Sequence, residues 1–558
     1  MIKDQLGHLI EQAVAKAYPE VHADVLLEKP SNPQFGDFAT NVALVLSKTV
    51  GKNPREIAQA IQENLSDKGG IIESSSIAGP GFLNFKIRPV RWIEALGEIA
   101  ARGERFGQTD AHKGEKVIVE LVSANPTGPL HIGNARGGPL GDAIASLLQS
   151  VGYEVTREYY LNDVGGQIEK LGESLLHYLK ESAGIKSQGE VGYQGEYVKE
   201  LSEAARRQFG DSLVKKGEAE AACRAEAVSL LGKFLTEEIR RDCEAMAIRF
   251  DSWVHEKDFL EKGTTQKIIG ELNKKKVTIE KEGALWFVPR DEFIEDRECV
   301  LVKSDGRPTY FANDIAYHAD KYSRGFDRLV NIWGANHHGH VPRIQAGMKA
   351  LGFDPEKLQT VLYQYVRVVR GKETVKMSKR AGDFVTAREV LDEVGKDALR
   401  FFLLLRAPES HLDFDLELAK KQSAENPVYY VQYAHARISS IFAKADEGGI
   451  KPPDGFDPDF VNQLGLPEEI ALAQMLVDFP SVVELSAEKL DPHRIAYYLL
   501  DLARLFQHYY DRARGDDRYR VITGDKGRTQ AKLFFVGCFR QVMRNGLSLL
   551  GISAPERM

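Results

Sequence analysis

A strand-like run of apolar residues leads through a turn rich in proline and glycine into a helix, and this succession limits the fold more than any other feature. The run is VIVELV at 117–122, and the turn SANPTGPLHIGN spans 123–134. A helix-like segment, GDAIASLLQSVGY at 141–153, is followed by a second strand-like run, EVTREYYL, at 154–161. A strand, a crossover helix and a second strand form a βαβ unit, which needs a parallel sheet covered by helices. The pattern therefore predicts an α/β fold.

The remaining sequence divides into parts around this unit. At about 150 residues per domain, 558 residues correspond to between three and four domains. We expect an α+β domain in 1–106, with a strand-like ADVLLEK and a hairpin around Gly79–Gly81. Residues 107–396 form the α/β domain, with a charged helical insertion at about 170–250 and further strand-like runs such as PTYFAND. In 397–558 strand signals disappear and apolar residues recur at helical spacing, which predicts a helical bundle.

The composition limits which partners the protein can bind and in which cellular compartment it can work. The formal net charge is 74 − 81 = −7, so nucleic acid has to bind at local basic patches. The four cysteines stand at least twenty residues apart, which fits neither a disulfide framework nor a CxxC metal or redox motif. The N-terminus carries acidic residues and no apolar run of the kind found in signal peptides, and no window approaches eighteen apolar residues. We expect a soluble, cytoplasmic protein without a membrane partner.

The turn after the first strand is the first candidate for chemistry. Free amides at the start of a helix favour an anion such as phosphate. The spacing Gly128 to Gly133 matches the first part of a P-loop, but Asn134 and Ala135 stand where Lys and Ser or Thr are required, and no GxGxxG follows either strand. The turn is therefore neither a Walker site nor a dinucleotide fingerprint. His131 and Asn134 remain as donors to phosphate oxygens that gain charge in a phosphoryl or nucleotidyl transfer.

A basic loop much further along the chain is the second candidate. It reads GKETVKMSKRAG at 371–382 and places Lys376 and Lys379 on either side of Met377 and Ser378. Mobile ammonium groups of this kind suit a pyrophosphate leaving group. A basic run alone is most often a solvated loop, but its combination with the His131 turn favours nucleotidyl transfer.

Together the two motifs resemble the signatures of class I aminoacyl-tRNA synthetases. PLHIGN is similar to the HIGH motif and KMSKR to the KMSKS motif, in the same order along the chain. Asn134 replaces the last His of HIGH but keeps a hydrogen-bond donor, and Arg380 replaces the last Ser of KMSKS while both lysines stay. Longer strings resemble arginyl-tRNA synthetases over essentially the whole chain: VELVSANPTGPLHIGNARGGPLGD, YYLNDVGGQI, YQGEY, PTYFANDIAYH, GKDALRFF, NPVYYVQYAHARI and LLGISAPERM.

The resemblance implies a Rossmann-like catalytic domain with a helical insertion, an N-terminal additional domain and an α-helical anticodon-binding domain. It implies that L-arginine and ATP, with Mg²⁺, form arginyl-adenylate before the arginyl group passes to the terminal adenosine of tRNA(Arg). His131 and Asn134 would stabilise the phosphates, and Lys376 and Lys379 would hold the pyrophosphate. The implied ATP-binding residues are Pro129, His131, Gly133, Asn134, Gly334, Asn336, His337, Lys376, Met377, Ser378 and Lys379.

A pocket for arginine needs carboxylates, because a guanidinium is planar and permanently charged. Glu120 ends the first sheet strand, and Asp314 ends the strand-like PTYFAND, four residues after Tyr310. We expect them to converge at the carboxyl edge of the sheet, where open α/β folds bind ligands. An uncharged amino acid would leave carboxylates unpaired, so discrimination needs no proofreading domain, and the insertion is not assigned to editing. The resemblance assigns arginine to Glu120, Ser123, Asn125, His131, Tyr310, Asp314 and His338.

The histidine run GANHHGH at 334–340 invites comparison with a metal site. Three imidazoles without a nearby cysteine are compatible with zinc. The resemblance implies instead that this loop lines the ATP and arginine site, and zinc is not expected.

Aromatic and basic residues alternate along the C-terminal helices. Unpaired RNA bases stack on such rings while nearby cations meet the phosphates. Tyr430 and Tyr433 are three residues apart and share a helix face, whereas Tyr429 is expected in the core. The resemblance places Tyr430, Tyr433, Tyr510 and Met558 against the anticodon loop. It also implies a monomer whose N-terminal domain, with NPQFGDF at 32–38, touches the tRNA elbow.

Three alternatives stay open at this stage. Another class I aminoacyl-tRNA synthetase is one, although those for cysteine and methionine commonly carry Cys-based zinc sites. A nucleotidyltransferase of related fold also uses a His-rich turn, but it has no use for a tyrosine-bearing anticodon bundle. A catalytically silent tRNA-binding relative usually loses one of the residues that correspond to His131, Lys376 and Lys379, and all of them are present here.

Overall fold

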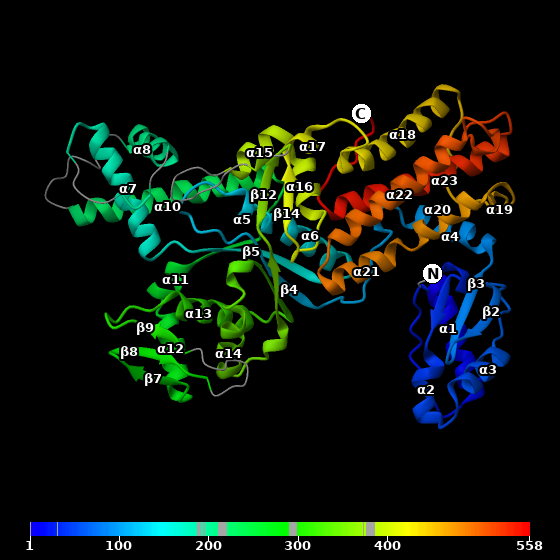
Figure 1. The fold of residues 1–558 in the computed structure, drawn as a ribbon, viewed down its shortest axis with the longest axis horizontal. Coiled ribbons are helices and arrows are strands. Elements are labelled where there is room, and N and C mark those ends of the chain that lie inside the picture. Colours follow the sequence, from blue (N-terminus) through cyan, green and yellow to red (C-terminus); the bar gives the residue numbers. More distant parts are fainter. Residues whose placement is uncertain are drawn as a thin grey trace.

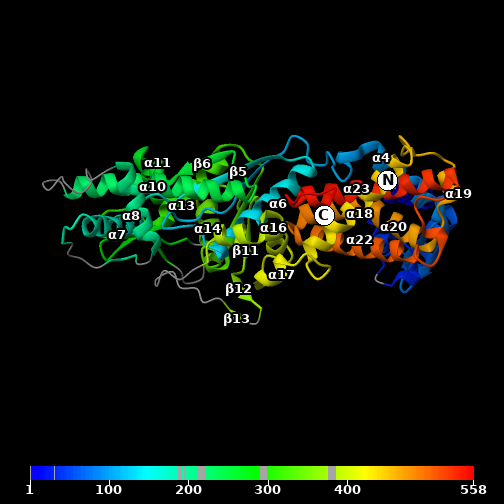
Figure 2. The same cartoon turned by 90° about the horizontal axis from the view of Figure 1, so that it is seen from above.

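The computed structural model describes residues 2–30, 32–186, 191–193, 196–209, 220–289, 298–371, 373–374 and 385–558. The molecule is elongated (Figures 1 and 2). A helical insertion lies at one end, the parallel sheet lies in the middle, and the C-terminal helices lie at the other end beside the N-terminal domain.

The centre is a five-stranded parallel sheet in the order β11-β10-β4-β5-β6. Its strands are β4 (Lys116–Glu120), β5 (Glu154–Leu161), β6 (Ser252–His255), β10 (Arg328–Gly334) and β11 (Leu358–Tyr363). Val117, Ile118 and Val119 are fully buried, as is typical of a sheet covered on both faces. The expected βαβ unit is confirmed, because α5 (Ile132–Ala135) and α6 (Gly137–Ser150) connect β4 to β5. Strand order reverses between β4 and β10, so the topological switch point lies there.

Two long insertions separate the later strands of this sheet. Helices α7 (Gly166–Ser182), α8 (Glu196–Phe209) and α10 (Glu220–Ala245) follow β5 and confirm the expected helical insertion. Between β6 and β10 lie α11 (Glu256–Glu261), α12 (Thr264–Lys274), the antiparallel strands β7 (Thr278–Lys281), β8 (Ala284–Phe287) and β9 (Cys299–Val302), and α13 (Tyr310–Ser323). The short helix η4 (Ala335–His337), α14 (Val341–Leu351) and η5 (Pro355–Lys357) connect β10 to β11.

The expected strand PTYFAND is wrong, because this segment begins helix α13. Thr309 caps the helix with its hydroxyl oxygen. Phe311 and Ile315 recur at helical spacing and are buried, and burial of this face outweighs the strand preference of Tyr and Phe. Tyr310 and Asp314 still share one side, since residues four apart lie on one face of a helix.

The N-terminal domain confirms the expected hairpin. Its elements are α1 (Ile2–Ala17), η1 (Pro33–Phe35), β1 (Phe38–Thr40), α2 (Val42–Val50), α3 (Pro54–Asn64), β2 (Ile72–Ala78) and β3 (Phe82–Ile87), and its sheet order is β1-β3-β2. The expected strand ADVLLEK is wrong, because only Glu28 pairs there, in an isolated bridge with Ala39. Helix α4 (Pro89–Arg102) and η2 (Gly103–Arg105) lead into the sheet domain.

The C-terminal part is helical, as expected, with one exception. Its helices are α15 (Ala387–Val394), α16 (Lys396–Leu404), α17 (Leu416–Lys420), α18 (Pro427–Glu447), α19 (Phe460–Gln463), α20 (Pro467–Val477), α21 (Phe479–Lys489), α22 (His493–Arg512), η6 (Asp517–Tyr519) and α23 (Lys526–Leu549). The expectation that strands end before Asp397 is wrong at β14 (Leu412–Asp415). β14 pairs in parallel with β12 (Val366–Arg370), and β12 also pairs with β13 (Glu373–Thr374). With four residues, β14 is too short to leave a clear pattern in the sequence.

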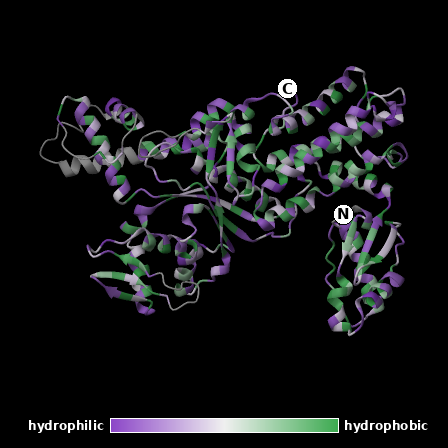
Figure 3. Ribbon diagram, in the orientation of Figure 1, coloured by the Kyte–Doolittle hydropathy of each residue, from purple (hydrophilic) through white to green (hydrophobic). Residues whose placement is uncertain are grey.

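The bundle helices alternate hydrophobic and hydrophilic stretches (Figure 3), as amphipathic helices do when they share a core. One segment, Pro467–Lys489, is apolar and long enough to cross a membrane, with half of its most apolar window buried inside the structure. This segment consists of α20 and α21, which pack on α4, α6 and α22. Its contacts are those of core helices in a bundle.

Helix α16 connects distant parts of the chain through one buried arginine. The guanidinium of Arg400 has no exposed surface and donates to Oδ2 of Asp142 in α6 at 2.6 Å. It also donates to the carbonyl oxygens of Met246, after α10, at 2.9 Å and of Leu550, after α23, at 2.8 Å. The helical insertion, the helix behind the His131 turn and the C-terminal segment therefore meet at one side chain.

Candidate functional site

The loop that follows β4 begins with a strained turn. Val122 and Ser123 both have positive φ, 67° and 38°, in a region that non-glycine residues occupy at a cost of about 1–3 kcal/mol. Two hydrogen bonds to β5 hold this turn. Ser123 Oγ accepts from the amide of Tyr160 at 3.1 Å, and the hydroxyl of Tyr159 donates to the carbonyl oxygen of Ala124 at 2.7 Å. Such strain is concentrated at ligand sites, and nothing in the sequence predicts it here.

His131 caps helix α5 just beyond this turn. Its Nδ1 accepts a hydrogen bond from the amide of Gly133 at 2.9 Å. The neutral imidazole therefore carries its proton on Nε2, which is a hydrogen-bond donor. A Cβ on Gly133 would lie 2.9 Å from His131 Nδ1, so glycine leaves room for the ring. Pro129 and Asn134 flank this cap and are half-buried.

The segment after the basic loop pairs with the same turn. The amide of Ile132 donates to the carbonyl oxygen of Val385 at 3.2 Å, and the amide of Ala387 donates to that of Leu130 at 2.7 Å. The downstream end of the KMSKR segment is therefore anchored beside His131, although the two motifs are far apart in the sequence. The expected phosphate-binding residues Lys376, Met377, Ser378 and Lys379 lie outside the described residues.

The loop that follows β10 lies across the switch point from the His131 turn. Gly334 ends this strand, and a Cβ there would lie 2.6 Å from Oδ1 of Asn336. The side chain of Asn336 thus folds back over the glycine. His337 and His338 continue the loop and are exposed. In the described part of the chain, no group of three or more His, Cys, Asp or Glu side chains is arranged to hold a metal ion.

The two carboxylates expected to hold arginine have different surroundings. Glu120 is 3% exposed, and it accepts from Nζ of Lys321 at 2.5 Å and from Nε1 of Trp333 at 3.3 Å. Asp314 Oδ2 accepts from Nε2 of His340 at 2.7 Å, and both of these side chains are partly exposed. The charge of Glu120 is therefore balanced by a buried cation, whereas the partner of Asp314 is an accessible imidazole.

Tyr310 and Asn125 lie where α7 begins. Tyr310 is 42% exposed, and its hydroxyl lies 2.6 Å from the position that a Cβ would take on Gly165. Gly165 has φ 96°, so both the backbone and the close approach of Tyr310 require glycine. Asn125 Nδ2 donates to Oε1 of Gln167 at 3.0 Å. The start of α7 therefore joins the loop after β4 to the first turn of α13.

A third carboxylate, Glu256, is absent from the expected residues. It is 1% exposed, and its Oε1 accepts from Nδ2 of Asn313 at 2.5 Å. Its Oε2 accepts, also at 2.5 Å, from the side-chain amide of Asn162 when that amide turns its nitrogen toward the carboxylate. Burial, with the nearby charges of Asp314 and Asp163, raises the pKa of Glu256 to about 8. The group is therefore mostly protonated at neutral pH.

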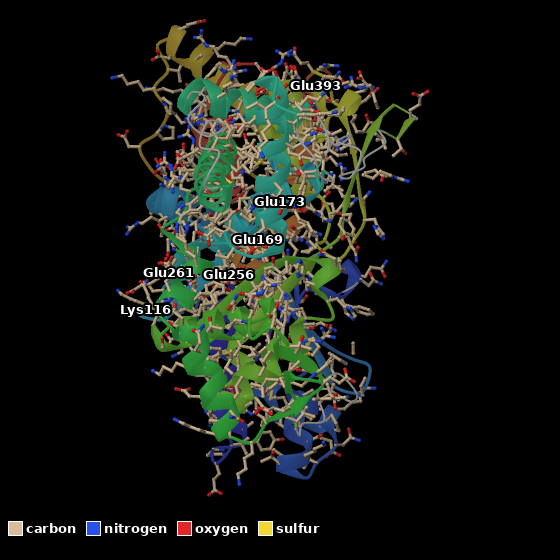
Figure 4. All side chains as sticks on the ribbon, turned by 90° about the vertical axis from the view of Figure 1, so that its left-hand side faces the viewer. Lys116, Glu169, Glu173, Glu256, Glu261 and Glu393 are labelled. Carbon is tan, nitrogen blue, oxygen red and sulfur yellow. The ribbon has the colours of Figure 1, made fainter. Side chains whose placement is uncertain are left out.

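The sequence does hold a signal for this residue. Glu256 follows β6 directly, just as Glu120 ends β4, so both stand at the carboxyl edge of the sheet. Figure 4 shows Glu256 and Glu261 at the two ends of α11, below Glu169 and Glu173 of α7. Asp314, Glu256 and Glu120 all act electrostatically on Tyr160 of β5, so these carboxyl groups lie near one another, and we call them the acidic pocket. Such a cluster suits a cation such as a guanidinium, and the His131 turn that follows β4 suits an anion.

The residues expected to bind RNA lie on the C-terminal bundle. The guanidinium of Arg437 lies over the rings of both Tyr433 and Tyr510, 4.6 Å from each centroid, and donates to the hydroxyl of Tyr433 at 2.7 Å. We call these side chains the aromatic face. The core position expected for Tyr429 is wrong, because its ring stacks on Tyr433 at 5.9 Å. Tyr430 instead packs against the hydrophobic core.

The C-terminal segment lies beside this bundle. His435 Nδ1 bonds the carbonyl oxygen of Pro555 at 2.8 Å, and Gln432 donates to that of Ser553 at 2.9 Å. The side chain of Met558 beyond them is 51% exposed. In the expected elbow-binding segment, Phe35 is 50% exposed. Both positions leave an apolar side chain open to a partner.

Three family models match this chain in succession. Residues 4–87 match the arginyl tRNA synthetase N terminal domain, 96–413 match the class I (R) tRNA synthetase catalytic domain, and 431–558 match the DALR anticodon binding domain. The arginine–tRNA ligase of Syntrophotalea carbinolica is 44% identical over 568 residues, with all of both chains covered. That of Citrifermentans bemidjiense is 46% identical over 95% of this chain and 94% of its own. The structure of Thermus thermophilus arginyl-tRNA synthetase covers 100% of both chains with a TM-score of 0.76 and 26% identity.

Proposed function

Because the chain belongs to the arginyl-tRNA synthetase family, we propose which of its residues carry out each step by which arginine is attached to tRNA. The protein is an ATP-dependent arginine–tRNA ligase of class I. The reaction has two steps: the carboxylate of arginine attacks the α-phosphorus of ATP, and the arginyl group then passes to the 3′-terminal adenosine of tRNA(Arg).

We assign the phosphates to the start of α5. His131 donates from Nε2 and Asn134 from its side-chain amide to oxygens on which negative charge grows during attack. ATP enters as its magnesium complex, and Lys376 and Lys379 hold the departing pyrophosphate. Anchoring of the downstream end of this loop at Leu130 and Ile132 supports the assignment. No protein nucleophile takes part, so positioning and electrostatics supply the catalysis.

We assign the adenosine to the two loops at the switch point. Gly334 leaves room for the folded-back side chain of Asn336, whose amide can hydrogen-bond a base at this loop. His337 of the same loop and Pro129 and Gly133 of the loop after β4 complete the wall. Open α/β sheets bind nucleotides at such a crevice, outside the carboxyl ends of the strands.

We assign the guanidinium to Asp314 and Glu256, with Tyr310 at the mouth of the acidic pocket. Bound arginine would replace His340 as the partner of Asp314. Glu256 would give up its proton beside the incoming cation, because an adjacent positive charge favours the carboxylate form. Glu120 lines the pocket, but its charge is met by Lys321, so it contributes shape more than charge. Ser123, Asn125 and His338 lie on the loops that border arginine's backbone end.

We assign the anticodon to the aromatic face, with Tyr430 and Met558 at its border. Half-buried rings with a cation among them can stack on unpaired bases without demanding a rigid fit. The N-terminal domain contacts the tRNA elbow in the same proposal. The enzyme works in the cytoplasm as a monomer, and no zinc is required.

The observation that carries the arginine assignment is the burial of Glu256 beside Asp314, because a bound cation would stabilise the ionised forms of both carboxyl groups. The test is attachment of each labelled amino acid to total tRNA by the purified enzyme. We expect labelling with arginine alone, and labelling that is lost when ATP is left out. Comparable labelling with lysine would contradict the proposed pocket.

A further inference from the structure

Tyr160 presents a buried hydroxyl that has no partner. The residue is on β5 and is 7% exposed, and its hydroxyl oxygen forms no hydrogen bond within the described parts of the chain. Two other buried tyrosines nearby are both satisfied. Tyr159 donates to the carbonyl oxygen of Ala124 at 2.7 Å, and Tyr317 donates to Oε1 of Glu158 at 2.8 Å. An unpaired buried hydroxyl disfavours the folded state, so this one needs an explanation.

The ring of Tyr160 is held firmly in place. Its amide donates to Ser123 Oγ at 3.1 Å, and its ring stacks on that of Tyr317 with centroids 4.2 Å apart and planes inclined by 19°. Successive side chains of a strand point to opposite faces, so Tyr159 and Tyr160 diverge. Tyr159 stacks on Trp253, on the side away from α13.

The surroundings of the hydroxyl are acidic. Burial raises the pKa of Tyr160 well above its ordinary value, and the negative charges of Asp314, Glu256, Glu120 and Asp163 raise it further. The phenol therefore stays protonated, with one proton to donate and lone pairs to accept. An ionised carboxylate cannot donate to it, so a ligand that carries N–H groups would be a suitable donor to its oxygen from the pocket side.

We propose that Tyr160 is a specificity-determining residue for arginine, whose hydroxyl accepts one guanidinium N–H and donates its own proton to a pocket carboxylate. A guanidinium has five N–H donors in a plane, more than two carboxylates need. Tyr160 takes one of the remaining donors without adding charge. The described residues of the chain give the hydroxyl no partner, and bound arginine would supply one. The inference rests on the proposed arginine pocket.

The test is Tyr160→Phe in the full-length enzyme, which we expect to be more stable to heat but to use arginine less well. Removing an unpaired hydroxyl raises the thermal midpoint of the free enzyme, and removing an acceptor for arginine raises KM for arginine roughly tenfold. KM for ATP stays unchanged. The matched control is Tyr498→Phe in the bundle, whose hydroxyl donates to the carbonyl oxygen of Met475 at 2.9 Å. The control lowers the thermal midpoint and leaves KM for arginine unchanged.

Each other outcome overturns the inference. A lower thermal midpoint for Tyr160→Phe means that the hydroxyl already has a partner in the free enzyme. An unchanged KM for arginine means that the substrate does not use it. Asp314→Asn, measured in parallel, distinguishes a wrong role for Tyr160 from a wrong arginine pocket. If Asp314→Asn raises KM for arginine and Tyr160→Phe does not, only the role of Tyr160 is wrong. If neither variant changes KM, the proposed pocket is wrong as well.

Discussion

The acidic pocket and the aromatic face both deal with guanidinium groups, but in opposite ways. In the proposed pocket the protein supplies carboxyl groups, and the cation belongs to the substrate. On the aromatic face the cation is the protein's own Arg437, half-buried over two tyrosine rings. Coulomb energies are several-fold larger in a buried site than in water, and salt screens exposed charges more strongly. The pocket can therefore select one amino acid in a single large step, whereas the face adds many small contributions over a long RNA.

The largest expected effect tests whether the two regions work independently. Arginyl-tRNA synthetases are unusual in needing tRNA before they activate their amino acid, and α16 offers a physical connection. Arg400 binds Asp142 behind the His131 turn and Leu550 near the C-terminus. We expect arginine-dependent exchange of pyrophosphate into ATP to be negligible without tRNA and to appear when tRNA(Arg) is added. Substantial exchange in carefully tRNA-free enzyme would show that the pocket is complete on its own.

The next effect isolates the pocket. Asp314→Asn keeps the shape and removes the charge, so we expect KM for arginine to rise by roughly 30- to 1,000-fold, the scale of about 2–4 kcal/mol for a buried charge left unpaired. Aminoacylation kinetics measure this, and KM for tRNA stays unchanged. The control is Asp305→Asn, whose exposed pair with Arg307 lies in the loop before α13. If Asp314→Asn leaves KM for arginine unchanged, Asp314 does not bind arginine.

The pH dependence of arginine binding is the third test. Glu256 has a pKa of about 8 in the free enzyme and is mostly protonated at pH 6.5, and a bound guanidinium favours its ionised form. Arginine binding thus releases a proton, and KM for arginine falls roughly tenfold as pH rises from about 6.5 to 8.5. Calorimetry in buffers of different ionisation enthalpy measures the released proton. Glu256→Gln flattens the profile, and an identical slope in that variant would contradict the assignment.

The raised pKa of Glu256 also makes the free energy of unfolding depend on pH. The folded-state pKa is raised above the ordinary value of 4.5, so the folded protein binds this proton more tightly than the unfolded chain. The contribution of Glu256 to the free energy of unfolding is therefore largest below about pH 4.5 and falls as pH rises toward 8. Glu256→Gln removes this part of the dependence.

The smallest expected effect concerns the aromatic face. Arg437→Ala removes two cation–π contacts and the hydrogen bonds to Tyr433 and Gln507, so we expect KM for tRNA to rise about three- to tenfold while KM for arginine stays unchanged. The difference shrinks as salt is raised, because the contact to RNA is partly exposed. Arg514→Ala is the control, since that side chain is 81% exposed and pairs only loosely with Asp511, at 3.6 Å. A salt-independent loss would indicate a purely structural role.

Local patterns predicted the framework of the fold. The run at 117–122 indicated β4 because strands buried on both faces are continuously apolar, and the run at 154–161 indicated β5 as the second strand of the βαβ unit. PTYFAND misled because its aromatic residues favour strands, whereas its helix depends on burial of Phe311 and Ile315 against elements distant in sequence. β14 was missed because its four residues form a strand only through their pairing with β12.

The pairings around the candidate site could not be predicted. Glu120 ends strand β4 as expected, whereas Asp314 lies on helix α13, and the partner of Glu120 is Lys321, 201 residues away, which no sequence pattern joins to it. Glu256 was missed because its raised pKa comes from burial and from the charges of Asp314 and Asp163, which are not its neighbours in the chain. The strained turn at Val122 was invisible for a related reason, since tertiary hydrogen bonds hold it.

The buried Arg400 also decides how the end of this chain can be treated. Met558 is exposed, so an appended tag meets no obstacle there, but Leu550 supplies an acceptor to a guanidinium that has no contact with water. Gly551 follows at a positive φ, and a Cβ there would collide with the same guanidinium. Shortening the chain past Leu550 removes one acceptor of this buried guanidinium, which keeps its hydrogen bonds to Asp142 and Met246. The C-terminus can therefore be extended beyond Met558, whereas the residues around Leu550 belong to the buried interior of the protein.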